Sequence, residues 1–349
     1  MQECRRIGYE NIRKDCSIKY FAPKGASLMG EKLKRSLSMD FVNEKLEEFN
    51  NFLDGKKVAI IGMGVSNVPL LDYFYDKNAK VTVFDKRNLS DEIMEKINKY
   101  RYEVEIGEDN LSRLHGYDVI FRSPSALPTI PEFVEEVERG ALLTSEIEMV
   151  LKLAPCKVIG VTGTEGKTTT TSIIYEILKQ TGRNCFLGGN IGKPIFTKVK
   201  DMRPDDIIVL ELSSFQLMGM EVSPHISVIT NIGTSHIGNL GSRQNILKAK
   251  LEILDGMQPD APLILNADDP HLAPLAGTLD RPVYTYGLNA KDADVTAEDV
   301  QEGENATTFT IVTKDGRTFP AELPCVGLHN VMNALAAFCV GRICGIAPD

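Results

Sequence analysis

Hydrophobic residues recur along most of the chain with the two periods that distinguish strands from helices. Short runs rich in β-branched residues predict strands at residues 57–61, 80–84 and 118–122, the last of them short and half-buried. Amphipathic stretches predict helices around them, for example at 41–53 and 131–139. Because strands alternate with helices, we expect a parallel sheet with helices on its faces.

A second series of the same kind follows Pro155. It contains buried strands, long helices and a hairpin around Lys314-Asp315-Gly316. The strands are expected at 157–161, 207–212, 226–231, 263–266, 309–313 and 318–323, and the helices at 167–180, 244–254 and 330–343. The predicted fold class is therefore α/β, with two Rossmann-like or P-loop parallel-sheet domains in tandem.

The first 38 residues lack this regular pattern. They contain nine basic and four acidic residues, a net charge of +5 in a chain whose total is −9. We interpret them as a disordered extension, with a basic tail for an acidic partner as the alternative. A length of 349 residues corresponds to two or three domains of ordinary size. We predict an extension at 1–38, an N-terminal Rossmann-like domain at 39–150 and a central P-loop domain at 151–349.

The composition excludes several classes of protein. The chain is 43% hydrophobic and 25% charged, as in globular rather than disordered or fibrous proteins. No apolar run approaches the roughly 18 residues that cross a bilayer. The net charge argues against a general nucleic-acid coat but not against a local phosphate site. The seven cysteines are scattered and form no C-x-x-C pair, so we expect no disulfide framework or zinc site. We predict a protein of the reducing cytoplasm.

The strongest chemical signal is the segment Gly163-Thr164-Glu165-Gly166-Lys167-Thr168-Thr169. It follows a predicted strand and opens a predicted helix, which is the context of a phosphate-binding loop. Its glycines allow main-chain N–H groups to surround an anion at the positive end of the helix. Lys167 would reach the outer phosphates of ATP, and Thr168 or Thr169 would offer a hydroxyl to Mg²⁺. Glu165 would repel a phosphate, so we expect its side chain to point away.

Other polar residues are weaker candidates for a site. Glu211 lies near the carboxyl end of a strand, where ligands collect in doubly wound sheets, and is placed to bind Mg²⁺; a loop cap is the alternative. His236 follows the strand at 226–231, but a lone loop histidine is usually structural. Lys250 lies beside the apolar face of its helix, and its position alone indicates a surface lysine with a buried stem.

A first glycine turn, Gly62-Met63-Gly64-Val65-Ser66-Asn67, also follows a strand. Asp85 ends the next strand, as in the dinucleotide-binding fingerprint, but Asn67 stands in place of the third glycine. The layout predicts a nucleotide over the first strand, with Asp85 accepting a hydrogen bond from ribose or base. NAD, a UDP-sugar and a purely structural turn all remain open from the spacing.

These segments together resemble the Mur ligase family, which forms peptide bonds in the bacterial cell-wall precursor. Residues 46–225 resemble the D-glutamate-adding members of the family. The matching segments are 62–66, 84–87, 123–124, 162–169, 189–192, 211–217 and 327–335. The segment 211–217 is the most specific of them, and 327–335 is common to the whole family.

The resemblance implies a role for each matching residue. The uridine diphosphate part of the substrate would be held by Ser66, Asp85, Arg87 and Ser123. The muramoyl-alanine end would be held by Asn190, Ser213 and Gln216, and the adenine would be approached by Asn330 and Asn333. The phosphates of ATP would be bound by residues 163–169, and two Mg²⁺ ions by Thr168, Glu211, His236 and a carbamate formed on Lys250. The resemblance implies four catalytic groups, namely Lys167, Glu211, His236 and Lys250.

Three features depart from the family pattern. Ser125 and Glu165 stand where relatives usually carry other residues. Residues 230–349 read more like the D-alanyl-D-alanine-adding members, which indicates a mosaic. The family's third, C-terminal domain would begin where this chain ends, so we expect it to be absent and the activity of this chain to be low.

The resemblance implies ATP-dependent amide formation in peptidoglycan precursor synthesis, through an acyl phosphate. The substrates would be a UDP-N-acetylmuramoyl-peptide and an amino acid or dipeptide, bound by a monomer without nucleic acid or membrane. D-Glutamate addition to UDP-N-acetylmuramoyl-L-alanine is the first hypothesis. D-Alanyl-D-alanine addition to the muramoyl-tripeptide, a UDP- and ATP-binding module without turnover and an NAD-dependent enzyme are the alternatives.

Overall fold

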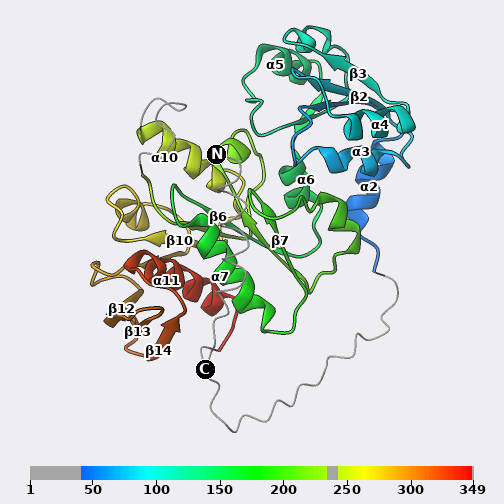
Figure 1. Ribbon diagram of the computed structural model, residues 1–349. Helices are drawn as coiled ribbons and strands as arrows, with labels where there is room; N and C mark the ends of the chain where they lie inside the picture. The colour runs from blue at the N-terminus through cyan, green and yellow to red at the C-terminus, as the bar shows by residue number, and fades with distance from the viewer. Residues whose placement is uncertain (1–40, 234–242, 348–349) are drawn as a thin grey trace.

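The computed structural model describes residues 41–233 and 243–347, which build two α/β sheets (Figure 1). The first sheet has five strands in the order β3-β2-β1-β4-β5, and every neighbouring pair is parallel. Its strands are β1 (Lys57–Ile61), β2 (Lys80–Asp85), β3 (Glu103–Ile106), β4 (Val119–Arg122) and β5 (Leu142–Thr144). The parallel sheet predicted for this half is confirmed.

Two strands of this sheet escaped prediction, and one was described wrongly. β3 is a short edge strand without a fully buried residue, and β5 has three residues, so neither carries a clear hydrophobic pattern. β4 was expected to be half-buried, which is wrong, because all four of its residues are buried. β4 lies inside the sheet, and its alternate side chains enter different hydrophobic clusters, as in parallel sheets covered on both faces.

Helices of ordinary length precede and connect the strands of the first sheet. The helix expected at 41–53 begins three residues later, because the Asn43 side chain accepts a hydrogen bond from Leu46 N and caps it. The helices here are α2 (Glu44–Phe52), α3 (Val68–Phe74), α4 (Asp91–Tyr100) and α5 (Pro131–Glu138), with a 3-10 turn η1 (Asn110–Arg113).

The second sheet has nine strands in the order β14-β13-β12-β11-β10-β9-β6-β8-β7. Its strands are β6 (Lys157–Thr162), β7 (Cys185–Gly189), β8 (Ile207–Glu211), β9 (Ile226–Ile229), β10 (Leu263–Asn266), β11 (Val283–Tyr286), β12 (Val295–Glu302), β13 (Thr307–Thr313) and β14 (Thr318–Leu323). The pairs from β7 to β12 are parallel, and β12, β13 and β14 are antiparallel. The predicted hairpin is β13–β14, and β7, β11 and β12 were not predicted.

Helices α7 and α11 pack together against the second sheet (Figure 1). The helix expected at 244–254 divides into α10 and a 3-10 turn. The helical elements of this half are α6 (Glu146–Leu153), α7 (Lys167–Lys179), η2 (Phe196–Asp201), α8 (Ser214–Leu217), α10 (Arg243–Leu251), η3 (Glu252–Leu254), η4 (Ala273–Gly277) and α11 (Leu328–Ile343). No helix in the described ranges is long and apolar enough to cross a membrane.

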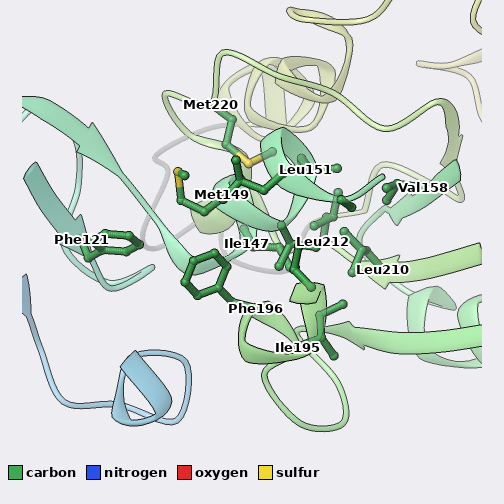
Figure 2. Close-up of a cluster of buried hydrophobic side chains, with 14 of the residues drawn as sticks. Phe121, Ile147, Met149, Leu151, Val158, Ile195, Phe196, Leu210, Leu212 and Met220 are labelled. Atoms are coloured by element: carbon green, nitrogen blue, oxygen red, sulfur yellow. The ribbon is translucent and has the colours of Figure 1, made fainter. Parts of the chain in front are cut away.

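One hydrophobic cluster joins the two sheets (Figure 2). It brings Phe121 of β4 together with Ile147 and Met149 of α6, Phe196 of η2 and Leu210 of β8. The boundary predicted between residues 150 and 151 falls inside α6, and the domain division stays a prediction. The extension predicted at 1–38 lies outside the described residues.

Candidate functional site: a phosphate loop and its carboxylate

The phosphate loop lies between β6 and α7, as its sequence predicts. Gly163 has φ +148° and Gly166 has φ +74°, conformations that favour glycine. A Cβ on Gly163 would overlap the Thr230 hydroxyl, and a Cβ on Gly166 would overlap Asn333 Oδ1. Both glycines are therefore required by backbone conformation and by close packing.

Two residues that follow β9 hold the phosphate loop by hydrogen bonds. Thr164 N donates to the Asn231 carbonyl oxygen at 2.9 Å, and Glu165 N donates to Asn231 Oδ1 at 2.9 Å. The Thr230 hydroxyl donates to the Glu165 carbonyl oxygen at 2.6 Å. Glu165 itself is exposed, in line with the expectation that it turns from the loop. Sequence reasoning missed Thr230 and Asn231, although their place after a buried strand, as for Glu211, was a usable signal.

Lys167 opens α7 and folds back over the loop. Its Nζ donates to the Thr164 carbonyl oxygen at 2.8 Å. Burial lowers the pKa of Lys167, and the carboxylates of Glu211 and Glu165 oppose this shift. The N–H groups in the first turn of a helix have no intrahelical acceptors, so this end of α7 suits an anion. Thr169, predicted with the loop, lies half-buried in the same turn.

Glu211, at the carboxyl end of β8, accepts hydrogen bonds from two other segments, α7 and the loop after β7. The Thr168 hydroxyl donates to Glu211 Oε2 at 2.7 Å. Asn190, in the loop after β7, donates through Nδ2 to Glu211 Oε1 at 2.8 Å. Glu211 is 2% exposed, so its charge is held beside the phosphate loop rather than in bulk water. The structure therefore brings Thr168, Asn190 and Glu211 together.

Lys250 is buried, which makes the surface-lysine interpretation wrong. It is 3% exposed, and Nζ donates to the Gly163 carbonyl oxygen at 2.7 Å and to Ser214 Oγ at 3.2 Å. Burial and the nearby Lys167 ammonium lower the pKa of Lys250 to about 7. The helix period failed here because α10 packs on α8 near the phosphate loop, a contact between distant segments. Ser214, its hydroxyl partner, was missed although it lies inside the predicted motif.

Ser213 and Gln216 form the cap of α8. Gln216 N donates to Ser213 Oγ at 3.3 Å, and Ser213 N donates to Gln216 Oε1 at 3.0 Å, which completes a capping box. These contacts assign both residues a structural role in shaping the turn after β8, beside the substrate-binding role predicted for them.

Of the two asparagines predicted near the adenine, Asn333 contacts the phosphate-loop region of the described chain, and Asn330 bonds within its own segment. Asn333 is buried, packs against Gly166 and accepts a hydrogen bond from the Thr170 hydroxyl at 3.1 Å. Asn330 is half-buried one turn earlier and donates to the Val326 carbonyl oxygen at 3.0 Å. Helix α11 thus contacts the loop at Gly166, as the segment after β9 does at Gly163.

The first glycine turn is held by Asp85. Its Oδ2 accepts from Met63 N at 2.8 Å, and its Oδ1 accepts from Arg87 N at 2.9 Å. The Arg87 side chain is 84% exposed, and its Nε lies 3.9 Å from Asp85 Oδ1. Asn67 explains the missing third glycine, because its amide donates to the carbonyl oxygens of Ile61 and Gly62 at 3.0 Å each.

Two predicted serines flank this turn. Ser66 is half-buried within it. Ser123 follows β4, and its hydroxyl lies 3.1 Å from the Ser125 hydroxyl and against Gly62. The predicted uridine-diphosphate residues therefore gather at the carboxyl end of the first sheet, and the ATP residues at the carboxyl end of the second.

The donor set around Glu211 suits Mg²⁺. A carboxylate, a hydroxyl and an amide are the hard oxygen ligands that this ion prefers. Within the described ranges, no group of three or more His, Cys, Asp and Glu side chains forms a metal cluster. His236, predicted as a ligand, lies outside the described residues.

The fold and the loop define an α/β protein with a glycine-containing turn between a strand and a helix, as in P-loop proteins. A family model described as the Mur ligase middle domain matches residues 161–341, and one described as the MurD-like N-terminal domain of Mur ligases matches residues 56–145. The chain belongs to the Mur ligase family.

Relatives with curated names refine this comparison. The chain is 38% identical over 307 residues to the UDP-N-acetylmuramoylalanine–D-glutamate ligase of Clostridium botulinum (strain Loch Maree / Type A3), covering 86% of this chain and 64% of the relative. It is 39% identical over 304 residues to the same-named ligase of Ruminiclostridium cellulolyticum, covering 85% and 63%. The chain thus spans somewhat less than two thirds of the length of these relatives.

Solved structures share the fold. A MurF ligase from Thermotoga maritima in complex with ADP aligns with a TM-score of 0.53 at 21% identity, covering 86% of this chain and 63% of that one. A UDP-N-acetylmuramate:L-alanyl-gamma-D-glutamyl-meso-diaminopimelate ligase from Neisseria meningitides aligns with a TM-score of 0.58 at 19% identity, covering 83% and 94%. At these identities the comparison supports the fold alone.

Proposed function

We propose that the protein is an ATP-dependent ligase that adds D-glutamate to UDP-N-acetylmuramoyl-L-alanine in peptidoglycan precursor synthesis. The observation that carries this proposal is the 38% identity to ligases of that name over 307 residues. A match of this length reaches into both halves of the chain. It favours D-glutamate over D-alanyl-D-alanine as the added group, although residues 230–349 read like the latter class.

The second sheet would bind ATP. Residues 163–169 and the start of α7 supply N–H donors for the phosphates, and Lys167 would exchange its bond to the Thr164 carbonyl for a phosphate oxygen. Asn333 packs against Gly166 and accepts a hydrogen bond from the Thr170 hydroxyl, which ties α11 to the loop. Asn330 and Asn333 would approach the adenine from α11. The ADP bound in the Thermotoga maritima relative supports nucleotide binding on this fold.

Two Mg²⁺ ions would be held beside this loop. Thr168 and Glu211 would bind one, and His236, Glu211 and a carbamate on Lys250 the other. When bound, the ions neutralise charge on the transferring phosphoryl group. The hydrogen bond from Asn190 to Glu211 Oε1 keeps the carboxylate oriented.

Lys250 meets the conditions for a carbamate. Only a neutral amine adds CO₂, and a pKa of about 7 leaves much of Lys250 neutral at physiological pH. Addition of CO₂ to the neutral amine forms an N–C bond and releases one proton. Together with the proton lost from the ammonium, two protons leave, and a buried cation becomes an anion. The new carboxylate would leave the contact with the Gly163 carbonyl oxygen and would attract metal instead.

The first sheet would bind the substrate. Asp85 fixes the glycine turn, Arg87 would pair with the diphosphate, and Ser66 and Ser123 would donate hydroxyls to it. Because the turn and the loop after β4 meet at Ser123, substrate binding there would order both. Asn190, Ser213 and Gln216 would meet the muramoyl-alanine end beside the phosphate loop.

The reaction would then run in two steps. The terminal alanine carboxylate of the substrate attacks the γ-phosphorus, ADP leaves, and an acyl phosphate forms. Lys167 and the α7 amides hold the phosphoryl oxygens during this step. The D-glutamate amine attacks the acyl carbon, and inorganic phosphate leaves with formation of the amide. We place this chemistry in the cytoplasm and in a monomer.

Titration calorimetry with UDP, ATP and NADH, beside a phosphate-release assay, tests the class of function. Binding of UDP and ATP with substrate-dependent phosphate release supports the ligase. Binding of both without release supports a non-catalytic module, and preferential NADH binding would overturn the proposal in favour of an NAD-dependent enzyme.

A further inference from the structure

Arg122, the last residue of β4, reaches from the first sheet to α8. It is 3% exposed. Its Nη1 donates to the Phe215 carbonyl oxygen at 3.4 Å, and its Nη2 donates to the Met218 carbonyl oxygen. Nη1 also donates to the Ala126 carbonyl oxygen at 3.2 Å, in the loop that follows β4. One buried cation therefore ties that loop to α8.

The electrostatic setting of Arg122 fits a positional role. Burial lowers its pKa, while the carboxylates of Glu148 and Glu252 oppose the shift. Within the described part of the chain, the guanidinium donates to three main-chain carbonyl oxygens. A planar guanidinium with several donors serves three such acceptors at once, which a lysine ammonium does less well.

Both ends of α8 are fixed by neighbouring elements. At its start, the Ser214 hydroxyl accepts from Lys250 Nζ at 3.2 Å. Just after its end, Gly219 N donates to Glu252 Oε2 at 3.0 Å. Gly219 also packs closely on Pro128 of the first sheet's loop, because a Cβ there would lie 3.0 Å from Pro128 Cγ. A helix of four residues has little stability of its own, so these contacts determine where it lies.

We propose that Arg122 is a positioning residue that fixes α8 against the loop after β4 and, through Ser214, fixes Lys250 against the phosphate loop. The inference rests on the proposed function, in which that loop carries the substrate residue Ser123 and Lys250 serves the ATP site. Substrate binding on the first sheet and the state of Lys250 are then coupled. Such coupling is a reciprocal free energy carried by an element that both sites contact.

The test compares wild type, Arg122→Met and Arg122→Lys with the control Arg113→Met, an exposed arginine of the first sheet that pairs with Glu105. Hydrogen exchange reports on residues 213–219, and mass spectrometry reports the rate of Lys250 acetylation by acetic anhydride, with and without saturating UDP.

We expect Arg122→Met to speed exchange of 213–219 about tenfold. We expect UDP to change the Lys250 rate about fivefold in wild type and in Arg113→Met, and not in Arg122→Met. Arg122→Lys should be intermediate.

Wild-type exchange and an unchanged UDP response in Arg122→Met would overturn the proposal. If Arg122→Met fails to fold, Ser214→Ala gives a second test, because it removes only the hydrogen bond between Lys250 Nζ and the Ser214 hydroxyl. It should keep 213–219 protected and lose the UDP response of Lys250; a wild-type response in this variant overturns the coupling. If calorimetry shows no UDP binding to wild type, the proposed substrate site fails. In that case the positioning role of Arg122 is judged from two measurements on Arg122→Met without UDP: hydrogen exchange of residues 213–219 and the rate of Lys250 acetylation.

Discussion

The Thr168 hydroxyl donates a hydrogen bond of 2.7 Å to Glu211 Oε2, which joins the first turn of α7 to the carboxyl end of β8. The other carboxylate oxygen of Glu211 accepts from Asn190. These two bonds hold the carboxylate in one orientation beside the phosphate loop. This arrangement reduces the ordering that nucleotide binding would otherwise require.

Glu211→Gln should weaken Mg²⁺-dependent ATP binding about tenfold or more, because it removes the buried charge but keeps the volume. Titration of ATP with and without Mg²⁺ measures the effect. Glu176→Gln, on the exposed side of α7, is the matched control and should bind as wild type. Equal ATP affinity in Glu211→Gln and in the control would argue against a metal role for this carboxylate.

Gly166→Ala should abolish measurable ATP binding, because the new methyl group meets Asn333 Oδ1 and the backbone has φ +74°. Gly182→Ala is a control with nearly the same φ of +76° and no neighbour within 4 Å. It should lose about 1 kcal/mol of stability or somewhat more from the backbone conformation and keep ATP affinity. Similar ATP affinities in the two variants would contradict the packing described for the loop.

Lys250 should carry a carbamate when CO₂ is present. Wild-type protein equilibrated with ¹³C-labelled bicarbonate should give a carbamate carbon signal that strengthens as the pH rises through about 7, where Lys250 loses its proton. Lys250→Arg should remove the signal, since a guanidinium stays protonated. Lys248→Arg, an exposed neighbour on α10, should retain it. A signal that survives in Lys250→Arg would assign the carbamate elsewhere.

Glu146 should make the stability of the protein depend on pH. Burial raises its pKa from the ordinary 4.5 to about 7, although the N–H groups of Ile195 and Phe196 donate to it at 3.0 and 2.9 Å. Between these two pH values the folded state holds a proton that the unfolded state has lost. Stability from this group is therefore greatest below pH 4.5 and decreases as the pH rises through 7, by up to about 3 kcal/mol.

Urea unfolding of wild type and Glu146→Gln between pH 4.5 and 8 measures this dependence. Glutamine does not titrate, so the variant should gain stability relative to wild type as the pH rises. Parallel pH profiles for the two proteins would show that Glu146 is already ionised in the folded state.

Local patterns predicted nine of the fourteen described strands and the strand–turn–helix context of residues 163–169, because these features depend on residues that are neighbours in sequence. Lys57–Ile61 and residues 163–169 are such cases. Lys250 could not be placed from its helix period, since its burial depends on Gly163, 87 positions away. Arg122 gave no signal either, because its partners are main-chain oxygens, two of which lie more than 90 positions later.

Asn67 shows a different limit. The missing third glycine weakened the nucleotide-binding pattern, yet the asparagine amide braces the same turn through Ile61 and Gly62. A spacing rule written for three glycines does not recognise a turn in which an asparagine amide stands at the third position. Asp85 was found by spacing, but its two bonds to main-chain N–H groups became visible only in the fold.

The most direct test of the account is phosphate release by this chain with two substrate pairs, at enzyme concentrations close to those of the substrates. One pair is UDP-N-acetylmuramoyl-L-alanine with D-glutamate, and the other is the UDP-muramoyl-tripeptide with D-alanyl-D-alanine. The account predicts ATP-dependent release with the first pair that exceeds release with the second. Faster release with the second pair would contradict the assignment of D-glutamate as the added group.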